Sequence, residues 1–139
     1  DFLGGGGGGG RGDQKGGDGG SGVVIVRESR LESSMTLVST ATTAQTAPTK
    51  GDIVMTYTNG AGTASINSDI TAEYSADDGS TWTTMTLASQ GTTGGHTILS
   101  AHDVALTSTT GTTMRYRLKT LNQSASKDTR IHAVSLGWS

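Results

Sequence analysis

From residue 35 to the C-terminus, apolar and polar residues alternate with a period of two in short runs rich in Thr and Val. This alternation predicts β-strands that bury one face. Clusters of Gly, Asn, Asp and Ser separate the runs and are typical of turns. We therefore expect strands at residues 35–41, 53–58, 66–75, 81–88, 96–99, 104–108, 113–121 and 130–138.

The alternation is most regular at residues 113–121. One face of this strand would enter the core, and it carries Met114, Tyr116 and Leu118. The opposite face carries three cations, Arg115, Arg117 and Lys119. At residues 130–138, apolar side chains occur on both parities, which predicts a strand that is central in a sheet or lies at a subunit contact.

About eight short strands, with no helix-period segment longer than two turns, predict an all-β fold. A β-sandwich of the jelly-roll type is the architecture we expect for residues 35–139. The stretch 59–62 and the pairs at 78–79 and 94–95 are the clearest turn signals within it.

The chain begins very differently, because 13 of its 22 glycines lie between residues 4 and 22. Glycine loses the most backbone entropy on ordering, so this tract predicts an extended segment without a core of its own. A β-branched run at 23–26 follows, which predicts a strand buried on both faces or paired at an interface. We divide the chain into a glycine-rich segment at 1–27 that closes an upstream module, a linker at 28–34 and the β domain. Since residue 1 is not Met, we expect Asp1 to lie inside a longer polypeptide.

Composition narrows the classes of protein. Apolar residues make up 32% and aromatic residues 4% of the chain, so a lean core that is supplemented by another subunit is expected. A net charge of -2 gives no basic field for nucleic acid, and no stretch is long and apolar enough for a membrane span. The absence of Cys excludes disulfides and thiolate metal sites.

Residues 75–82 carry the one sharply defined motif. It resembles the Asp-box hairpin, S-x-D-x-G-x-T-W, of sialidases and many secreted β proteins, with matches at Ser75, Asp77, Gly79, Thr81 and Trp82. In those families the box is structural, and we expect the same here. The alternative is a sugar- or calcium-binding role for Asp77 and Asp78.

Other reactive residues form no recognisable catalytic pattern. The histidines at 96, 102 and 132 lack metal-ligand spacing, although the pair 102–103 could supply two ligands. Carboxylates suited to glycoside hydrolysis are present at 69, 73, 77, 78 and 103, but in a polar β domain such groups mostly cap turns. Arg11-Gly12-Asp13 matches the integrin tripeptide, which we regard as coincidence in this tract. We expect no enzyme activity and no cofactor.

Surface contacts offer a second class of site. The cation stripe could meet an acidic glycan or an acidic subunit, or it could protect a solvated sheet edge against pairing. Loops at 59–63, 77–82 and 91–96 are the candidate glycan-contact regions, with Trp82 and Tyr74 as stacking platforms that could equally be core. The candidate glycan-contact residues are Asn59, Asp78, Trp82, His96, Arg115 and Arg117.

The phrase Gly-Gly-Ser-Gly-Val-Val-Ile-Val-Arg at 19–27, after a polyglycine tract, resembles the end of glycine-rich modules in bacteriophage tail fibres and related virion proteins. Residues 35–41 and 132–138 are similar to a small β domain at the ends of phage structural proteins. The resemblance carries no catalytic residues. It implies a non-enzymatic virion protein, the C-terminal part of a tail fibre or similar appendage, that forms a homotrimer, contacts other virion proteins and touches host-surface glycan.

Two other functions remain open. The first is a capsid decoration or head-fibre protein whose glycine arm lies along another subunit. The second is a carbohydrate-binding module of a secreted bacterial protein, which would need an exposed aromatic row. One Phe, two Trp and three Tyr make such a row hard to assemble.

Overall fold

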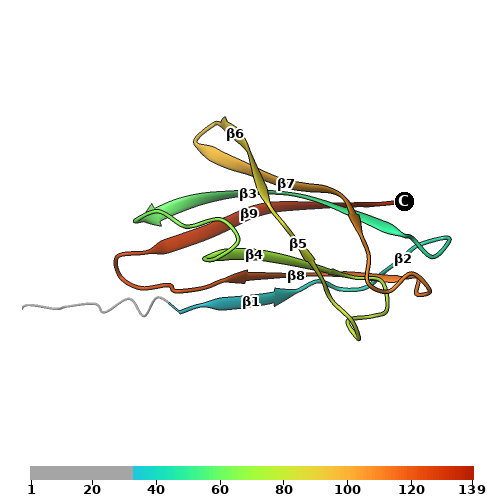
Figure 1. Cartoon of the computed structure of the whole chain (residues 1–139). Coiled ribbons are helices and arrows are strands. Elements are labelled where there is room, and N and C mark those ends of the chain that lie inside the picture. The colour runs from blue at the N-terminus through green and yellow to red at the C-terminus, as the bar shows by residue number, and fades with distance from the viewer. Residues whose placement is uncertain (1–32) are drawn as a thin grey trace, which may run out of the picture. The chain divides into compact units, whose positions relative to one another are not determined.

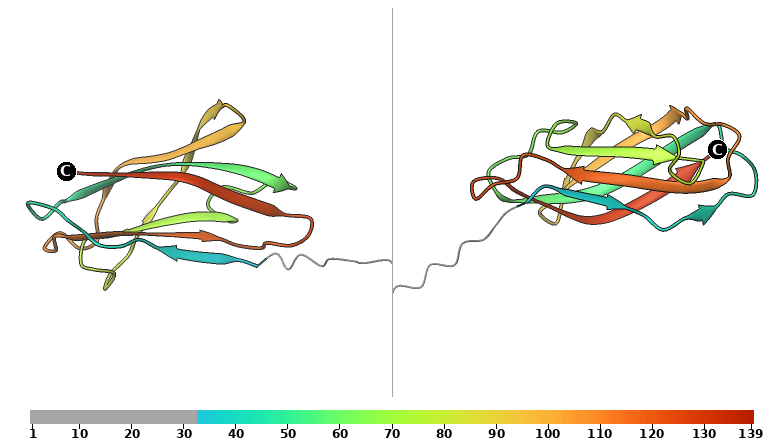
Figure 2. Two further views of the ribbon diagram at one scale, coloured as in Figure 1. Left: turned by 180° about the vertical axis from the view of Figure 1, so that it is seen from behind. Right: turned by 90° about the horizontal axis from the view of Figure 1, so that it is seen from below.

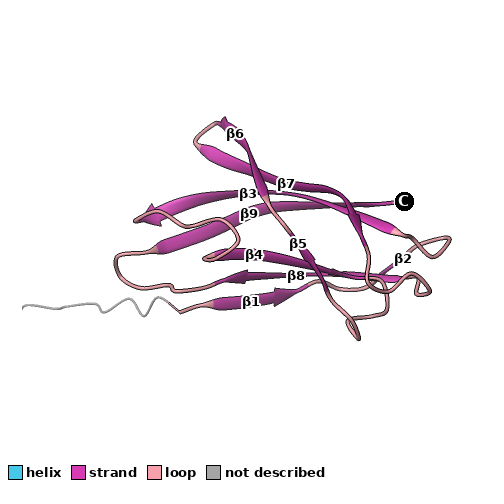
Figure 3. Ribbon diagram, in the orientation of Figure 1, coloured by secondary structure: helices cyan, strands magenta, loops and turns pink. Residues whose placement is uncertain are grey.

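The computed structural model describes residues 33–139, which form two antiparallel sheets packed face to face (Figures 1 and 2). The first sheet has the order β1-β8-β4-β5, with β2 also paired to β8, and the second has the order β6-β7-β3-β9. The prediction of an all-β sandwich is confirmed, and the described part of the chain holds strands and loops without a helix (Figure 3). Hence no described segment forms the long apolar helix that crosses a membrane. The predictions for segment 1–27, for strand 23–26, for the Arg11-Gly12-Asp13 tripeptide and for most of linker 28–34 lie outside the described residues.

The strands of the first sheet are β1 (Met35–Val38), β2 (Thr42–Thr43), β4 (Ile70–Ser75), β5 (Thr83–Met85) and β8 (Thr113–Thr120). Those of the second sheet are β3 (Lys50–Ala61), β6 (Ala88–Thr93), β7 (His96–Ala105) and β9 (Asp128–Trp138). Both sheets turn one face inward, as the period of two predicts. The fully buried side chains between them include Ile53, Met55, Ile70, Tyr74, Met85, Leu99, Met114 and Leu118.

Tyr74, one of the two candidate stacking platforms, belongs to this core. Its side chain is fully buried, and its hydroxyl donates to the carbonyl oxygen of Gly137 at 3.2 Å. Burial raises the pKa of Tyr74 to about 12. Tyr74 therefore joins the two sheets and presents no ring to a surface ligand.

Several predicted strands differ in their bounds. The run at 35–41 is interrupted between β1 and β2 at Ser39, whose backbone N–H donates to Tyr116 O and whose side chain accepts from Tyr116 N–H. The run at 66–75 forms a strand only from Ile70, because Asn67 has a φ of 65° and pairs its side-chain amide with the backbone of Leu87.

β7 is one strand where the sequence predicts two, at 96–99 and 104–108. The intervening residues form a β-bulge, since the register with β3 shifts between Gly51 and Ile53 and Asp103 has a φ of 53°. The N–H of Asp103 donates to Asp52 Oδ1 at 2.7 Å. A bulge places polar residues inside a continuous strand, so it imitates a loop in the sequence.

β6 was expected in part as the candidate glycan loop at 91–96. Its six residues are all exposed, and it pairs with β7 through a two-residue turn at Gly94 and Gly95, both of positive φ. Two positive φ values suit the right-handed twist of a hairpin. The turn is therefore predictable, whereas the polar strand that precedes it carries no apolar alternation.

Among residues 33–139, β9 pairs only with β3 and is an edge strand of its sheet, so the prediction of a central position is wrong for the described domain. A register shift between Thr56 and Tyr57 inserts a bulge opposite β3. The bulge turns Ile131 and Val134 toward the same core despite their opposite parities. The other possibility for this strand, a subunit contact, stays a prediction.

Candidate functional site

The turn at residues 75–82 is held by hydrogen bonds among its own signature residues. Ser75 Oγ donates to Asp77 Oδ1 at 2.8 Å and accepts the N–H of Gly79 at 2.8 Å. The backbone N–H of Thr81 donates to Asp77 Oδ1 at 2.8 Å, and the hydroxyl of Thr81 donates to Oδ2 at 2.6 Å. Both carboxylate oxygens of Asp77 thus have partners inside the turn.

These bonds also set the ionisation of Asp77. The hydroxyl of Thr81, followed by its backbone N–H, lowers the pKa of Asp77 to about 2. The carboxylate is therefore charged throughout the physiological range and stabilises the turn as an acceptor. A general acid needs a pKa close to the working pH, and this group has moved away from it.

Gly79 and Trp82 complete the turn. Gly79 has a φ of 89°, and a Cβ added there would lie 3.1 Å from Trp82 Cζ2. The indole therefore packs against the glycine, as the motif predicts. On the first sheet, the guanidinium carbon of Arg117 lies 4.3 Å from the centroid of the Trp82 ring. Arg117 thus occupies one face of the candidate stacking platform.

The cation stripe on β8 is paired with carboxylates of β4 and of the turn that follows it. Arg117 binds Glu73 through two hydrogen bonds of 2.6 Å, and Lys119 Nζ lies 2.9 Å from the same carboxylate. Arg115 Nε lies 2.5 Å from Asp78 Oδ1, at the turn. The interpretation of the stripe as an edge-protecting device is wrong, because β8 lies between β1 and β4.

Glu73 is the centre of this charged face. Its side chain is 16% exposed, and its pKa is lowered chiefly by the hydrogen bonds from Arg117, against the opposing effect of burial. A planar bidentate pair is the strongest arrangement available to these two groups. We refer to Glu73, Asp78, Trp82, Arg115, Arg117 and Lys119 as the charged face.

A second buried carboxylate, Asp69, joins two loops. Its side chain is 3% exposed and accepts from the N–H of Ser65, from Asn122 Nδ2 and from Lys127 Nζ, at 2.8, 2.8 and 2.7 Å. The hydrogen bond from Lys127 is the main reason why the pKa of Asp69 lies well below its usual range. This carboxylate therefore joins the loop before β4 to the loop between β8 and β9.

The histidines do not converge on a metal site. The rings of His96 and His132 meet edge to face with centroids 4.4 Å apart, and Thr58 Oγ1 lies 2.7 Å from His132 Nε2. His102 is elsewhere, at the β7 bulge, with Nδ1 3.5 Å from Asp52 Oδ1. Within residues 33–139, no group of three or more metal-ligating side chains occurs.

The candidate glycan-contact residues fall into two separate groups. Asp78, Trp82, Arg115 and Arg117 lie on or beside the charged face. Asn59 and His96 belong to the second sheet, where the loop after β3 and the β6–β7 turn lie at the end opposite the 75–82 turn (Figure 1). Asn59 Oδ1 accepts the N–H of Ala64 and closes its own loop.

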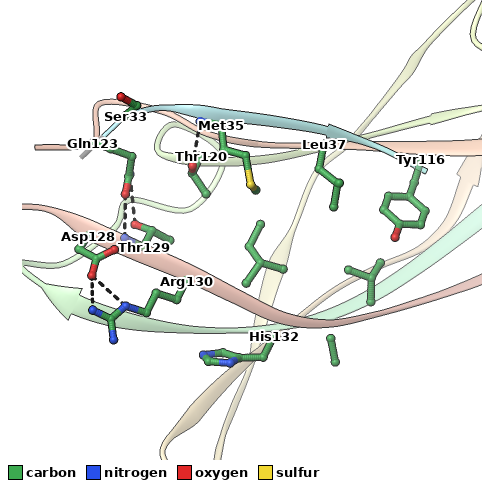
Figure 4. Close-up of a pocket in the computed structure, with 13 residues that line it drawn as sticks. Ser33, Met35, Leu37, Tyr116, Thr120, Gln123, Asp128, Thr129, Arg130 and His132 are labelled. Atoms are coloured by element: carbon green, nitrogen blue, oxygen red, sulfur yellow. Dashed lines mark hydrogen bonds and ion pairs between the residues drawn. The ribbon is translucent and has the colours of Figure 1, made fainter. Parts of the chain in front are cut away.

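A groove of about 540 Å³ lies between β1 and β9 (Figure 4), and no motif in the sequence indicates it. Met35 and Leu37 extend from β1 on one side, and β9 forms the other wall. We call this feature the β1–β9 groove. It is lined by Ser33, Met35, Leu37, Tyr116, Thr120, Gln123, Asp128, Thr129, Arg130, Ile131, His132, Ala133 and Val134.

The large hydrophobic residues that are exposed in the described chain gather on β1, where Met35 and Leu37 line the groove and Val38 lies on the other face of the strand. The exposed large hydrophobic residues of the described chain are Met35, Leu37 and Val38, at 39%, 41% and 46%, and all three lie on β1. The sequence predicts a strand at 35–41, but the exposure of Met35 and Leu37 depends on how the two sheets meet.

Comparison of the chain with known protein families, with curated proteins and with solved structures found no match.

Proposed function

We propose that this chain is a non-enzymatic structural protein of a bacteriophage virion, the C-terminal part of a tail fibre or similar appendage, which works as a homo-oligomer. The observation that carries the assembly role is the β1–β9 groove, where apolar side chains lie beside two strands that each pair on one side only within residues 33–139. Exposed apolar surface next to open strand edges is typical of a contact surface. The virion assignment rests on the resemblance of segment 19–27 and of the β domain to phage proteins.

The contacts of the reactive residues support a structural role. Asp77, Glu73 and Asp69 each accept hydrogen bonds from neighbouring groups of the fold, and each has a lowered pKa. Groups used in this way hold turns and strands together. A catalytic acid or base would instead need a pKa near the working pH and an open position for substrate.

The same contacts give less support to a carbohydrate-binding module. Arg117 lies over the Trp82 ring, Tyr74 is buried, and both oxygens of Asp77 are hydrogen-bonded within the turn. Contact with host-surface glycan, if it accompanies the structural role, would use loops outside these residues, such as the β6–β7 turn.

Native mass tests the proposal. Sedimentation of the full chain is compared with sedimentation of a chain that starts at Met35. We expect a trimer for the full chain, because a lean core and an open groove require cover from neighbours. A folded monomer across the micromolar range would overturn the homo-oligomeric assignment. A trimer in both proteins would place the main contacts in the β domain, and loss of the trimer on truncation would place them before residue 35.

A further inference from the structure

The β1–β9 groove has the shape and the free hydrogen-bonding groups to accept one more strand. β1 pairs with β8 on one side only, and β9 pairs with β3 on one side only. Each strand therefore leaves a row of backbone N–H and C=O groups without a strand partner among residues 33–139. Between these edges, Met35, Leu37, Ile131 and Val134 line an apolar floor. An extended apolar peptide could pair with the free backbone groups of a strand edge and cover the apolar side chains of the groove.

The chain itself contains a segment of matching chemistry. Residues 23–26, Val-Val-Ile-Val, form its one run of four successive apolar residues. β-branched side chains favour the extended conformation, and they would contribute apolar surface on both faces of an added strand. Eight residues, 27–34, separate this run from β1, and Ser33 lines the groove itself. Residues 27–34 therefore tether the run to β1, the strand that forms one wall of the groove.

The exposure of β1 indicates that a second copy supplies this segment. Leu37 pairs across the sheet with Leu118, on the core face, whereas Val38 pairs with Arg117, on the charged face. β1 thus exposes apolar side chains on both of its faces. A single strand of the same chain laid in the groove would cover Met35 and Leu37 and leave Val38 open. A neighbouring copy, which brings more than one strand, covers both faces.

We propose that residues 23–26 of a second copy of the chain add a strand in the β1–β9 groove, so that neighbouring subunits exchange this segment. The inference rests on the proposed homo-oligomer and adds the segment and the surface through which it forms. Exchange of identical segments between protomers closes open edges without a separate partner protein.

Disulfide trapping tests the exchange, since the chain has no Cys of its own. Two full-length proteins of different tag length are prepared, one carrying Val24→Cys and the other carrying Leu37→Cys, and they are unfolded, mixed, refolded and mildly oxidised. Ile25→Cys replaces Val24→Cys in a parallel sample, because successive side chains of a strand point to opposite faces. Ala133→Cys provides a second reporter in the groove, on β9, and removes no large apolar side chain. The matched control is Thr92→Cys on the exposed β6.

We expect disulfide-linked chains of unequal length when either Val24→Cys or Ile25→Cys meets a groove reporter, at about ten times the yield of the Thr92→Cys control. A double variant that carries both Val24→Cys and Leu37→Cys is oxidised in parallel. Three results would overturn the exchange. They are a disulfide that forms only within single chains of the double variant, no cross-link above the control with either reporter, or a disulfide between two Leu37→Cys chains in preference to the mixed pair. The native mass of the same samples separates the two proposals. An oligomer without the mixed cross-link contradicts the exchange alone, and a monomer contradicts the homo-oligomer as well.

Discussion

The charged face and the β1–β9 groove lie on the same sandwich, yet they have opposite relations to the rest of the chain. On the charged face, each cation of the β8 stripe has a carboxylate partner in β4 or in the turn that follows it, and Arg117 covers one face of the Trp82 ring. In the groove, apolar side chains and strand edges remain open. A surface whose groups already bind one another has little left for a ligand, whereas the groove is incomplete within residues 33–139. This difference is why we propose the groove, and not the charged face, as the contact surface.

The largest effect is expected from a charge placed in the groove. Leu37→Asp puts a carboxylate where an apolar contact is expected, and burial of an unpaired charge costs several kcal/mol. We expect sedimentation to show dissociation of the oligomer to monomers at micromolar concentration. Because Leu37 is 41% exposed in the single chain, the monomer should stay folded by circular dichroism. Thr92→Asp on β6 is the matched control and should keep the oligomer. An unchanged native mass of Leu37→Asp would contradict the proposal that subunits meet at the β1–β9 groove.

The next largest effect is expected from acid, which should destabilise the fold by protonating its hydrogen-bonded carboxylates. Asp77, Asp69 and Glu73 have lowered pKa values in the folded chain, so their contribution to stability is complete above their unfolded values of about 4. It is lost as the pH falls below about 4, toward the value of about 2 for Asp77. We measure the free energy of unfolding by urea titration of the monomeric Leu37→Asp variant. We expect it to be constant between about pH 5 and 7, above the unfolded pKa values, and to decrease steadily at lower pH. Constant stability down to about pH 2 would contradict the assigned network.

Substitutions of Asp77 and Asp78, one at a time, should distinguish the stability that comes from the turn from that of the surface ion pair. Asp77→Ala removes the acceptor of both Thr81 hydrogen bonds, and we expect it to lower the free energy of unfolding by about 2 kcal/mol. Asp78→Asn, next to it, removes the charge that pairs with Arg115 and keeps a residue type that tolerates the φ of 59° at this position, so it should cost less than about 1 kcal/mol. Chemical denaturation of the two variants measures the difference. Equal losses would show that the turn does not depend on the Asp77 contacts.

Gly79→Ala should have a smaller effect on the same turn. A φ of 89° is strained for alanine, and its Cβ would press on Trp82. We expect a loss of about 1 kcal/mol and a change in Trp fluorescence, since the indole must move. Gly91→Ala is the matched control, because Gly91 also has a positive φ but no atom within 4 Å of an added Cβ. The two variants should lose similar stability, and only Gly79→Ala should alter the fluorescence.

The smallest effect is expected at Arg115. The Arg115–Asp78 pair is partly exposed, so Arg115→Ala should cost at most about 1 kcal/mol, and the cost should fall in high salt. Arg117→Ala should cost more, because Glu73 is 16% exposed and would lose its bidentate partner. Urea denaturation at low and high salt distinguishes the two. An equal and fully salt-sensitive loss for both would contradict the special position of Glu73.

The sequence predicts the fold where alternation and turn chemistry act locally. The faces of β8, the Gly94–Gly95 turn and the contacts of the 75–82 motif all follow from nearest neighbours along the chain or across one turn. The prediction from sequence fails where a β-bulge shifts the alternation of inward and outward side chains by one residue. The bulge at His102 and Asp103 resembles a loop, and the bulge in β9 gives an edge strand the two-sided pattern of a central one.

The functional features divide in the same way. The Asp77 turn is readable because its signature residues lie within eight positions. The pairing of Arg117 with Glu73 depends on the register of β8 and β4, which the sequence does not state. The β1–β9 groove depends on how two sheets meet at their edges, so no local pattern predicts it. β6 is missing from the prediction because its polar residues carry no hydrophobic periodicity.

Amide hydrogen exchange of the native full chain tests the central claim most directly, because it compares both regions in one sample. Antiparallel strands bond alternate residues to each neighbour, so the outward-pointing amides of β1 and β9 exchange quickly unless another strand covers them. The account predicts that these amides are protected in the full chain and exchange rapidly in Leu37→Asp, while the amides of Gly79 and Thr81 are protected in both. Rapid exchange along the outer edges of β1 and β9 in the full chain would contradict it.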